Sequence, residues 1–253
     1  MTRELFHEKM DRLERETLDL GHIVAGETPA AIDAILRRDT QALEGIVARD
    51  RRINSERLAI EGQVILLIAT QQPVAGDVRL LASLIEVVAE IERMGDYAKG
   101  IAQIGLRLGG ASIPPEVARS LVTMADRCQD MLRRALNAFA ARDAEAAQAI
   151  IRDDEAIDTL YHQVFGAMLT LGAPDATQME RSNYILWIAH DIERTADRVT
   201  NICERIIYVV TGALVADEKS AMEVRLDAVA KGLAENEEDE GLAEGEEDEA
   251  PPE

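Results

Sequence analysis

The sequence predicts an all-α protein of two tandem, homologous three-helix bundles, followed by a disordered acidic C-terminal tail. Aromatic residues make up only 3% of the chain and hydrophobic residues 47%, which is typical of helices that pack through aliphatic side chains. Apolar residues recur at helical spacing along most of the chain, whereas strand signals are almost absent. Two blocks of sequence also occur twice in the same order, which indicates an internal duplication.

Three long helices are expected in the first half of the chain. The first covers about residues 3–36, and GETP at 26–29 should kink or briefly interrupt it, because proline lacks a backbone donor and clashes with the preceding turn. The second takes Asp39 as its N-cap and ends near Gln71. The third covers about residues 77–108.

Three more helices are expected in the second half. The segment GGASIPP at 109–115 is the clearest boundary, and a helix over about 115–141 follows it. Asp143 caps the next helix, which ends near residues 171–175. The last helix extends from there to about Thr211.

The repeat relates these two halves to each other. RDTQALEGIVARDRRIN at 38–54 aligns with RDAEAAQAIIRDDEAID at 142–158, an offset of 104 residues. ERMGDYAKGI from Glu92 aligns with ERTADRVTNI from Glu193, an offset of 101 residues. The difference falls between the two blocks, where a loop can change length without disturbing the helices. Two homologous three-helix units therefore account for the pattern.

We accordingly divide the chain into a first repeat at 3–110, a second repeat at 111–212, and a weak helix with an acidic tail at 213–253. The net charge is −21, and residues 235–253 contain eleven acidic residues but no lysine or arginine. Such a segment has too little apolar surface to offset the entropy of ordering it, so we expect disorder. The remainder is still acidic, which argues against nucleic acid as a partner.

The protein is expected to be cytoplasmic. Cys128 and Cys203 are far apart in sequence, which is typical of buried thiols in a reducing compartment. The longest uninterrupted apolar run, VILLIA at 64–69, is too short to span a membrane, and the N-terminus lacks the hydrophobic region of a signal peptide. Any membrane association should be peripheral, through partners.

Each repeat contains two acidic residues four apart on a helix, where they project side by side: Glu92 and Asp96, then Glu193 and Asp197. Like charges at this spacing destabilise an isolated helix by roughly 0.2 to 0.5 kcal/mol, so each pair needs a positive partner. Each pair follows or adjoins the apolar stripe, which places it on a flank of the bundle and not in its centre.

A second acidic element precedes each pair on another helix of the same repeat, so that two antiparallel helices could offer four oxygen-bearing side chains to one groove. We name these the first acidic set and the second acidic set. They are, respectively, Asp50, Asn54, Glu92 and Asp96, and Asp154, Asp158, Glu193 and Asp197.

Two interpretations of these sets stay open. Hard oxygen ligands suit magnesium, manganese, calcium or iron better than a thiolate-type zinc site, and His162 and His190 could add nitrogen to the second set. Alternatively, the acids are solvated or paired with nearby arginines. The arginines considered are Arg51, Arg52, Arg93, Arg194 and Arg198. Motifs of nucleophilic catalysis, a P-loop and GxGxxG are missing, so we do not expect an enzyme.

The chain resembles the PhoU family over about residues 3–211, through its two repeats, PVAGDVRL before ERMGDYAKGI, and ERTADRVTNICE. The resemblance implies a homodimeric negative regulator of phosphate uptake and phosphate-starvation signalling. Such a protein would be an adaptor that contacts the ATPase subunit of the phosphate transporter and a sensor histidine kinase. The family's E(D)xxxD motifs, here Glu92 with Asp96 and Glu193 with Asp197, can carry iron or zinc clusters, with magnesium or manganese as other candidates.

Two features depart from the family pattern: the proline of GETPAAI in the first helix, and the acidic extension, for which solubility is the favoured role. The alternative function is a carboxylate-bundle protein for metal storage or redox chemistry, similar to ferritin. That alternative predicts bridging ligands inside a bundle core, whereas the helical spacing predicts flank positions.

Overall fold

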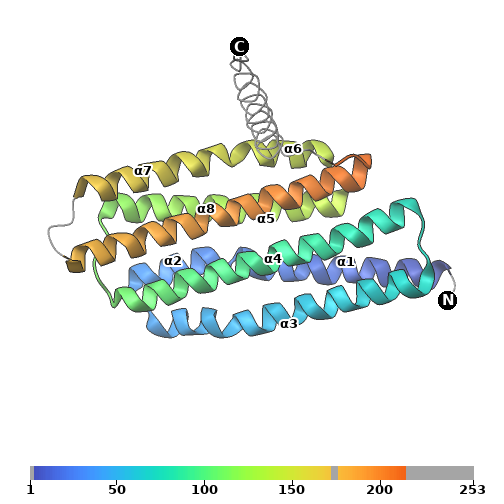
Figure 1. Ribbon diagram of the computed structural model, residues 1–253, viewed down its shortest axis with the longest axis horizontal. Helices are drawn as coiled ribbons and strands as arrows, with labels where there is room; N and C mark the ends of the chain where they lie inside the picture. The colour runs from blue at the N-terminus through green and yellow to red at the C-terminus, as the bar shows by residue number, and fades with distance from the viewer. Residues whose placement is uncertain (1–2, 172–175, 215–253) are drawn as a thin grey trace, which may run out of the picture. The chain divides into compact units, whose positions relative to one another are not determined.

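The computed structural model describes residues 3–171 and 176–214 (Figure 1). These residues form α-helices and contain no strand, which confirms the all-α class. The helices are α1 (Arg3–Ala25), α2 (Glu27–Arg37), α3 (Thr40–Gln71), α4 (Ala75–Leu108), α5 (Pro115–Ala141), α6 (Ala144–Asp153), α7 (Glu155–Leu171) and α8 (Ala176–Thr211). The weak helix and acidic tail expected beyond residue 214 lie outside the described residues.

The expected interruption of the first helix is confirmed at Gly26, between α1 and α2. The Gly26 N–H donates to the Ile23 carbonyl at 3.3 Å, three residues back, so the last turn of α1 tightens there. Pro29 then falls in the first turn of α2, where its missing N–H would have had no helical partner. Pro29 therefore lies in the first turn of a new helix and does not kink a continuous one.

The duplication extends to the backbone at the start of the second helix of each repeat. Asp39 caps α3 by accepting the N–H of the third residue on at 3.0 Å, and Asp143 caps α6 in the same way at 2.9 Å. The residues before them, Arg38 and Arg142, both adopt left-handed backbone conformations, with φ of 60° and 57°. Both predicted N-caps are thus present, and each follows the same turn.

The helix expected from Asp143 to about residue 171 is divided in the structure. It breaks at Asp154, where the N–H donates to the Ile151 carbonyl three residues back at 3.4 Å, and α7 begins at the next residue. No proline or glycine marks this break, so helical periodicity could not reveal it. The break falls on one member of the second acidic set.

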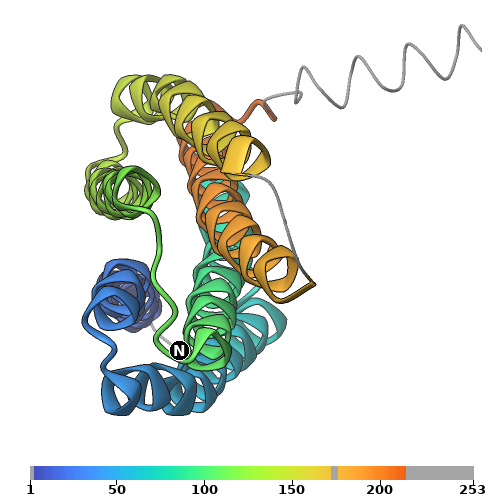
Figure 2. The same ribbon diagram turned by 90° about the vertical axis from the view of Figure 1, so that its left-hand side faces the viewer.

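The two repeats pack against each other mainly through α4 and α8, which lie side by side (Figure 2). Helices α1 and α2 also pack against α5. Within the repeats, α3 packs on α4, while α6 and α7 pack on α8. Both helices carry fully buried aliphatic side chains, which include Leu84, Val88 and Ile91 on α4 and Ile188, Ile192 and Val199 on α8.

The acidic side chain of Glu90 is buried near this interface. Its two carboxylate oxygens accept hydrogen bonds from Arg93 at 2.6 Å and from Arg198 and Asn201 at 3.3 Å. Burying a carboxylate is unfavourable unless it is paired and hydrogen-bonded. Because two of these donors lie on α8, the charge of Glu90 also fixes the register between the repeats. No helix in the described part of the chain is long and apolar enough to cross a membrane.

The tight approach of α4 to α2 yields a test of the packing. A Cβ added at Gly105 would lie 2.5 Å from Ile35 Cγ1 and 3.2 Å from Leu43 Cδ1. We expect Gly105→Ala to lower the melting temperature. Overpacking destabilises the fold by about 1 to 3 kcal/mol, whereas the higher helix propensity of alanine offsets only about 1 kcal/mol.

The matched control is Gly62→Ala, since a Cβ at this exposed position of α3 would meet no heavy atom within 4 Å. That substitution should raise stability by up to about 1 kcal/mol, again from propensity. Thermal unfolding followed by circular dichroism separates the two. A rise in melting temperature for Gly105→Ala would show that α2 and α4 are not packed this closely.

Candidate functional site

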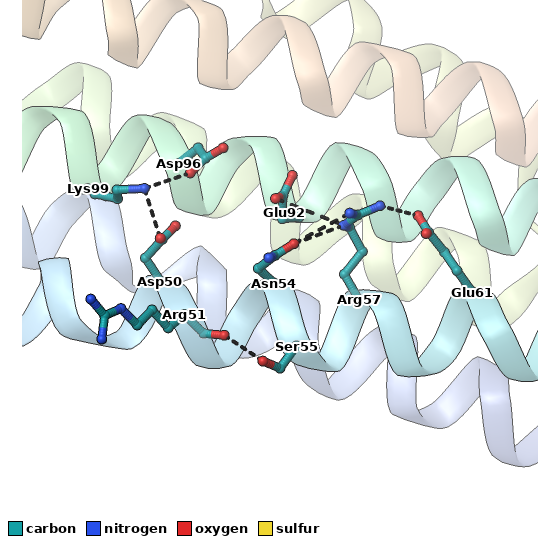
Figure 3. A network of polar contacts seen from close by, with 9 residues as sticks. All are labelled: Asp50, Arg51, Asn54, Ser55, Arg57, Glu61, Glu92, Asp96 and Lys99. Atoms are coloured by element: carbon teal, nitrogen blue, oxygen red, sulfur yellow. Dashed lines mark hydrogen bonds and ion pairs between the residues drawn. The ribbon is translucent and has the colours of Figure 1, made fainter.

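The structure brings the four side chains of the first acidic set together. Asp50 and Asn54 on α3 face Glu92 and Asp96 on α4 across the groove between these helices (Figure 3). The Asp50 and Glu92 side chains are 15% and 18% exposed, whereas Asp96 is 48% exposed. Asp50 and Glu92 therefore lie inside the groove, and Asp96 lies at its rim, on the flank of the bundle.

Lys99 lies between the two aspartates of this set. Its Nζ donates to Asp50 Oδ2 at 2.8 Å and to Asp96 Oδ1 at 3.3 Å, so one ammonium group bridges α3 and α4 (Figure 3). The hydrogen bond to Asp50 raises the pKa of Lys99, and the ammonium therefore stays charged. A groove of about 590 Å³ lies beside this bridge and is lined in part by Asp50, Arg51 and Lys99.

A second cation, Arg57 on α3, lies near the other end of the set. Its Nη1 pairs with Glu61 Oε1 at 2.6 Å, and its Nε and Nη2 donate to Asn54 Oδ1 at 3.4 Å. Its Nε also lies 3.9 Å from Glu92 Oε1. Each of the four predicted ligands in this set is thus near Lys99 or Arg57.

These cations do not fully offset the crowding of negative charge. Burial, followed by the charge of Asp96, raises the pKa of Glu92 above its usual range, although Arg57 opposes the shift. Burial also raises the pKa of Asp96, and its hydrogen bond with Asp50 adds to the effect. The ionised acids therefore remain under electrostatic strain in the folded protein.

Of the arginines proposed as neutralisers from the sequence, Arg93 does act on the first set, because its charge opposes the rise in the pKa of Glu92. Several of these arginines also have other contacts. Arg93 pairs with Glu90 at 2.6 Å. Arg194 lies over the ring of Tyr97, with its guanidinium carbon 4.6 Å from the ring centroid. Arg52 and Arg198 pair with Glu56 and Glu90, respectively.

Sequence reasoning thus missed Lys99 and Arg57 as the cations of the first set. The signal was present, because Lys99 follows Asp96 by three residues and Arg57 follows Asn54 by three. Residues at this spacing lie on one face of a helix. The contact from Lys99 to Asp50 on another helix could not be read from spacing within one helix.

The second acidic set has a different environment. Asp154 lies at the junction of α6 and α7, Asp158 lies on α7, and Glu193 and Asp197 lie on α8. Burial raises the pKa of the Cys128 thiol on α5, and the charges of Asp154, Asp197 and Glu193 raise it further. Three members of the set therefore lie near enough to act on one buried thiol.

The Cys128 thiol joins α5 to α8 next to one member of the second set. Its Sγ donates to the carbonyl of Ile192, the residue before Glu193, at 3.4 Å. Asp154 Oδ1 and Glu193 Oε2 are themselves buried. A neutral, fully buried thiol is a poor metal ligand, because the thiolate is the form that binds metal.

The two histidines considered for the second set differ in position. His190 Nδ1 lies 3.3 Å from Glu193 Oε2, so it is adjacent to the set. The ring of His162 lies 5.6 Å from that of Tyr161, which in turn lies 6.1 Å from the ring of His190. His190 is thus the histidine with a direct contact to one of the predicted ligands.

The present side-chain arrangement does not form a metal site. A divalent ion needs several oxygen or nitrogen ligands directed at one point at about 2.0 to 2.6 Å. Among residues 3–171 and 176–214, no three His, Cys, Asp or Glu side chains are placed to hold a metal ion. Binding at either set would require side chains to rotate, and the metal ligands stay a prediction.

The fold and its paired acidic sets define a class: helical proteins made of a duplicated three-helix unit that carries an acidic set in each copy. The family model of the PhoU domain matches the chain twice, at residues 17–105 and 121–206. The protein belongs to the PhoU family.

Relatives agree with this assignment. The chain is 31% identical over 213 residues to a phosphate-specific transport system accessory protein PhoU homolog of Clostridium acetobutylicum, covering 84% of this chain and 97% of that one. The crystal structure of the phosphate transport system regulatory protein PhoU from Streptococcus pneumoniae matches with a TM-score of 0.75 and 31% identity, over 84% of this chain and all of that one. PhoU from Pseudomonas aeruginosa matches with a TM-score of 0.77 and 27% identity, over 82% and 100% of the two chains.

The strain on Glu92 gives a testable prediction. An acid whose pKa is raised on folding weakens the fold when it is ionised, so Glu92→Gln should stabilise the protein at pH 8 in chelator-containing buffer. The expected gain is roughly 0.2 to 0.5 kcal/mol, the size of a like-charge repulsion at this spacing. The gain should vanish as the pH falls through the raised pKa, where Glu92 of the unaltered protein is already protonated.

The control is Glu61→Gln, which removes the 2.6 Å partner of the same arginine. It should be neutral or destabilising by up to about 0.5 kcal/mol. Urea unfolding of both variants at pH 8 and at a pH below 4.5, the ordinary pKa of a glutamate side chain, makes the comparison. A loss of stability at pH 8 for Glu92→Gln would mean that its attraction to Arg57 outweighs the repulsion.

Proposed function

We propose that this protein is an accessory protein of a phosphate-specific transport system and acts as a negative regulator of phosphate uptake and phosphate-starvation signalling. The observation that carries the proposal is the double match to the PhoU domain, one match in each repeat. It is supported by a relative named as an accessory protein of that transport system, which this chain matches over nearly its full length. Regulation then occurs through binding, without chemistry at an active site.

We further propose that the regulator is an adaptor, which contacts the ATPase subunit of the transporter and a sensor histidine kinase. The rigid pairing of the two repeats suits this role, because it presents two similar surfaces in a fixed relation. Large apolar side chains are exposed at corresponding positions of the repeats, Ile65 on α3 and Leu169 on α7, at 57% and 65%. Exposed apolar side chains of this kind are available for partner contacts.

Removal of the gene tests the regulatory proposal. Cells that lack the protein should take up more phosphate in phosphate-rich medium and express phosphate-starvation genes there, because the negative signal is lost. A plasmid copy of the protein, or of the Gly62→Ala variant, should restore repression. Unchanged uptake and expression after deletion would contradict the proposal.

Retention assays with the purified protein test the proposed partners. The purified chain should retain the transporter ATPase and the histidine kinase at low salt, and light scattering of the eluted protein gives the number of copies, which we propose to be two. If neither partner is retained, the adaptor part of the proposal is contradicted. If the protein is a monomer, the proposed dimer is contradicted. Neither result bears on the regulatory phenotype of the deletion.

For metal binding, we propose that the second acidic set is the better candidate. It is supported by Asp154, Glu193 and Asp197, whose charges all raise the pKa of the Cys128 thiol, and by His190, whose Nδ1 lies 3.3 Å from Glu193 Oε2. A bound ion would neutralise these carboxylates and tie α6 and α7 to α8. The storage alternative receives less support, because the first set lies on a flank with Asp96 half exposed.

The metal proposal predicts which variants lose metal. Equilibrium dialysis of the purified protein against Mn²⁺ or, under anaerobic conditions, Fe²⁺ should show about one or more ions per chain, as expected for a carboxylate site. Glu193→Gln/Asp197→Asn should lose them, and Glu92→Gln/Asp96→Asn should retain them. Metal retained by the former variant would place the ions elsewhere.

A further inference from the structure

Neither cation of the first acidic set is repeated at the aligned position of the second repeat. In the aligned blocks ERMGDYAKGI and ERTADRVTNI, Lys99 of the first repeat corresponds to Thr200 of the second. The second cation differs in the same way, because Arg57 corresponds to Tyr161 when the alignment of the preceding helix is continued. The acids Asp50, Glu92 and Asp96 keep their type in the second repeat and Asn54 corresponds to Asp158, whereas Lys99 and Arg57 have no counterpart of the same charge at the aligned positions.

The Lys99 side chain occupies the space that a shared cation would need. Its ammonium lies 2.8 Å from one carboxylate oxygen on α3 and 3.3 Å from another on α4, so it already performs the bridging that an ion would perform. Thr200 has a neutral side chain, and its hydroxyl donates to the Asp197 carbonyl on its own helix at 2.7 Å. The second repeat thus has no lysine at the corresponding point.

An ion entering the first set would have to displace this bridge. It would need to break two charge-assisted hydrogen bonds, which are stronger than bonds between neutral groups. It would also approach the cationic side chains of Lys99 and Arg57, which are only 32% and 23% exposed, so solvent screens the repulsion weakly. Both effects oppose a divalent ion.

We infer that Lys99 closes the first acidic set to metal, with its ammonium group in the place of an ion, and that substituting Lys99 by the residue of the second repeat opens a metal site there. The function of this lysine is then to hold α3 and α4 together permanently. A metal-held pair would come apart when the ion is lost. The first repeat becomes the part of the protein whose groove does not respond to metal.

The experiment uses the full chain with the second set disabled by Glu193→Gln/Asp197→Asn, so that any ion bound reports on the first set. Equilibrium dialysis against Mn²⁺, with the metal measured by mass spectrometry, should find no ion at the first set of this background. Adding Lys99→Thr should yield about one Mn²⁺ per chain, held by the carboxylates and Asn54. Adding Lys99→Arg, which keeps the charge, should not.

Two further variants assign the ion. Asp50→Asn added to Lys99→Thr should abolish the gained Mn²⁺, because it removes the α3 carboxylate that Lys99 had bridged. Lys99→Gln removes the charge with a longer side chain and serves if Lys99→Thr folds poorly. Either uncharged variant should also show a rise in melting temperature on adding Mn²⁺ that the background lacks.

Two results would overturn the inference. One is an ion bound to the background through the first set and lost with Glu92→Gln, since Lys99 would then not exclude metal. The other is no gain of metal in either uncharged variant, since Lys99 would then not be the obstacle. Lys99 closes the first set whether or not the second set binds metal, so failure of the metal proposal for the second set is a separate outcome.

Discussion

The burial of α4 and α8 against each other is the constraint on which the rest of the structure depends. Each of these long helices packs against its partner and against other helices of its own repeat, and the buried positions of both are filled mainly by apolar side chains. On α4, exposed side chains are confined to a narrow strip at helical spacing, which includes Glu86, Arg93, Asp96 and Gln103. Exposed polar side chains on α4 therefore lie mainly along this strip.

The acidic sets follow from this constraint. Glu92 adjoins the strip and is half-buried where α3 packs, while Asp96 lies within it. A carboxylate at the edge of a packed interface is partly desolvated, which raises its pKa unless a cation is nearby. The groove must therefore contain positive charge, and the first repeat supplies it from the chain itself.

Duplication preserved the scaffold more strictly than the groove. The left-handed turn and the aspartate N-cap occur in both copies, and each copy contributes one long helix, α4 or α8, to the central pair. The break at Asp154 occurs in one copy, and Lys99 and Arg57 beside the first set likewise have no counterpart of the same charge at the aligned positions of the other copy. For the regulator that we propose, this pattern is physically reasonable, because a shared scaffold would keep two binding faces in register while the grooves differ.

The sequence by itself determined the helical class, the duplication, the caps at Asp39 and Asp143 and the residues of both acidic sets, because each depends on spacing within one helix or on similarity between repeats. Only the tertiary structure decided that Lys99 bridges two helices and that Glu90 joins the repeats. Those contacts connect residues that are far apart in the chain, and helical periodicity carries no information about which side chain of a neighbouring helix will lie opposite. The break at Asp154 was also decided by the structure, because its cause is a local tightening without glycine or proline.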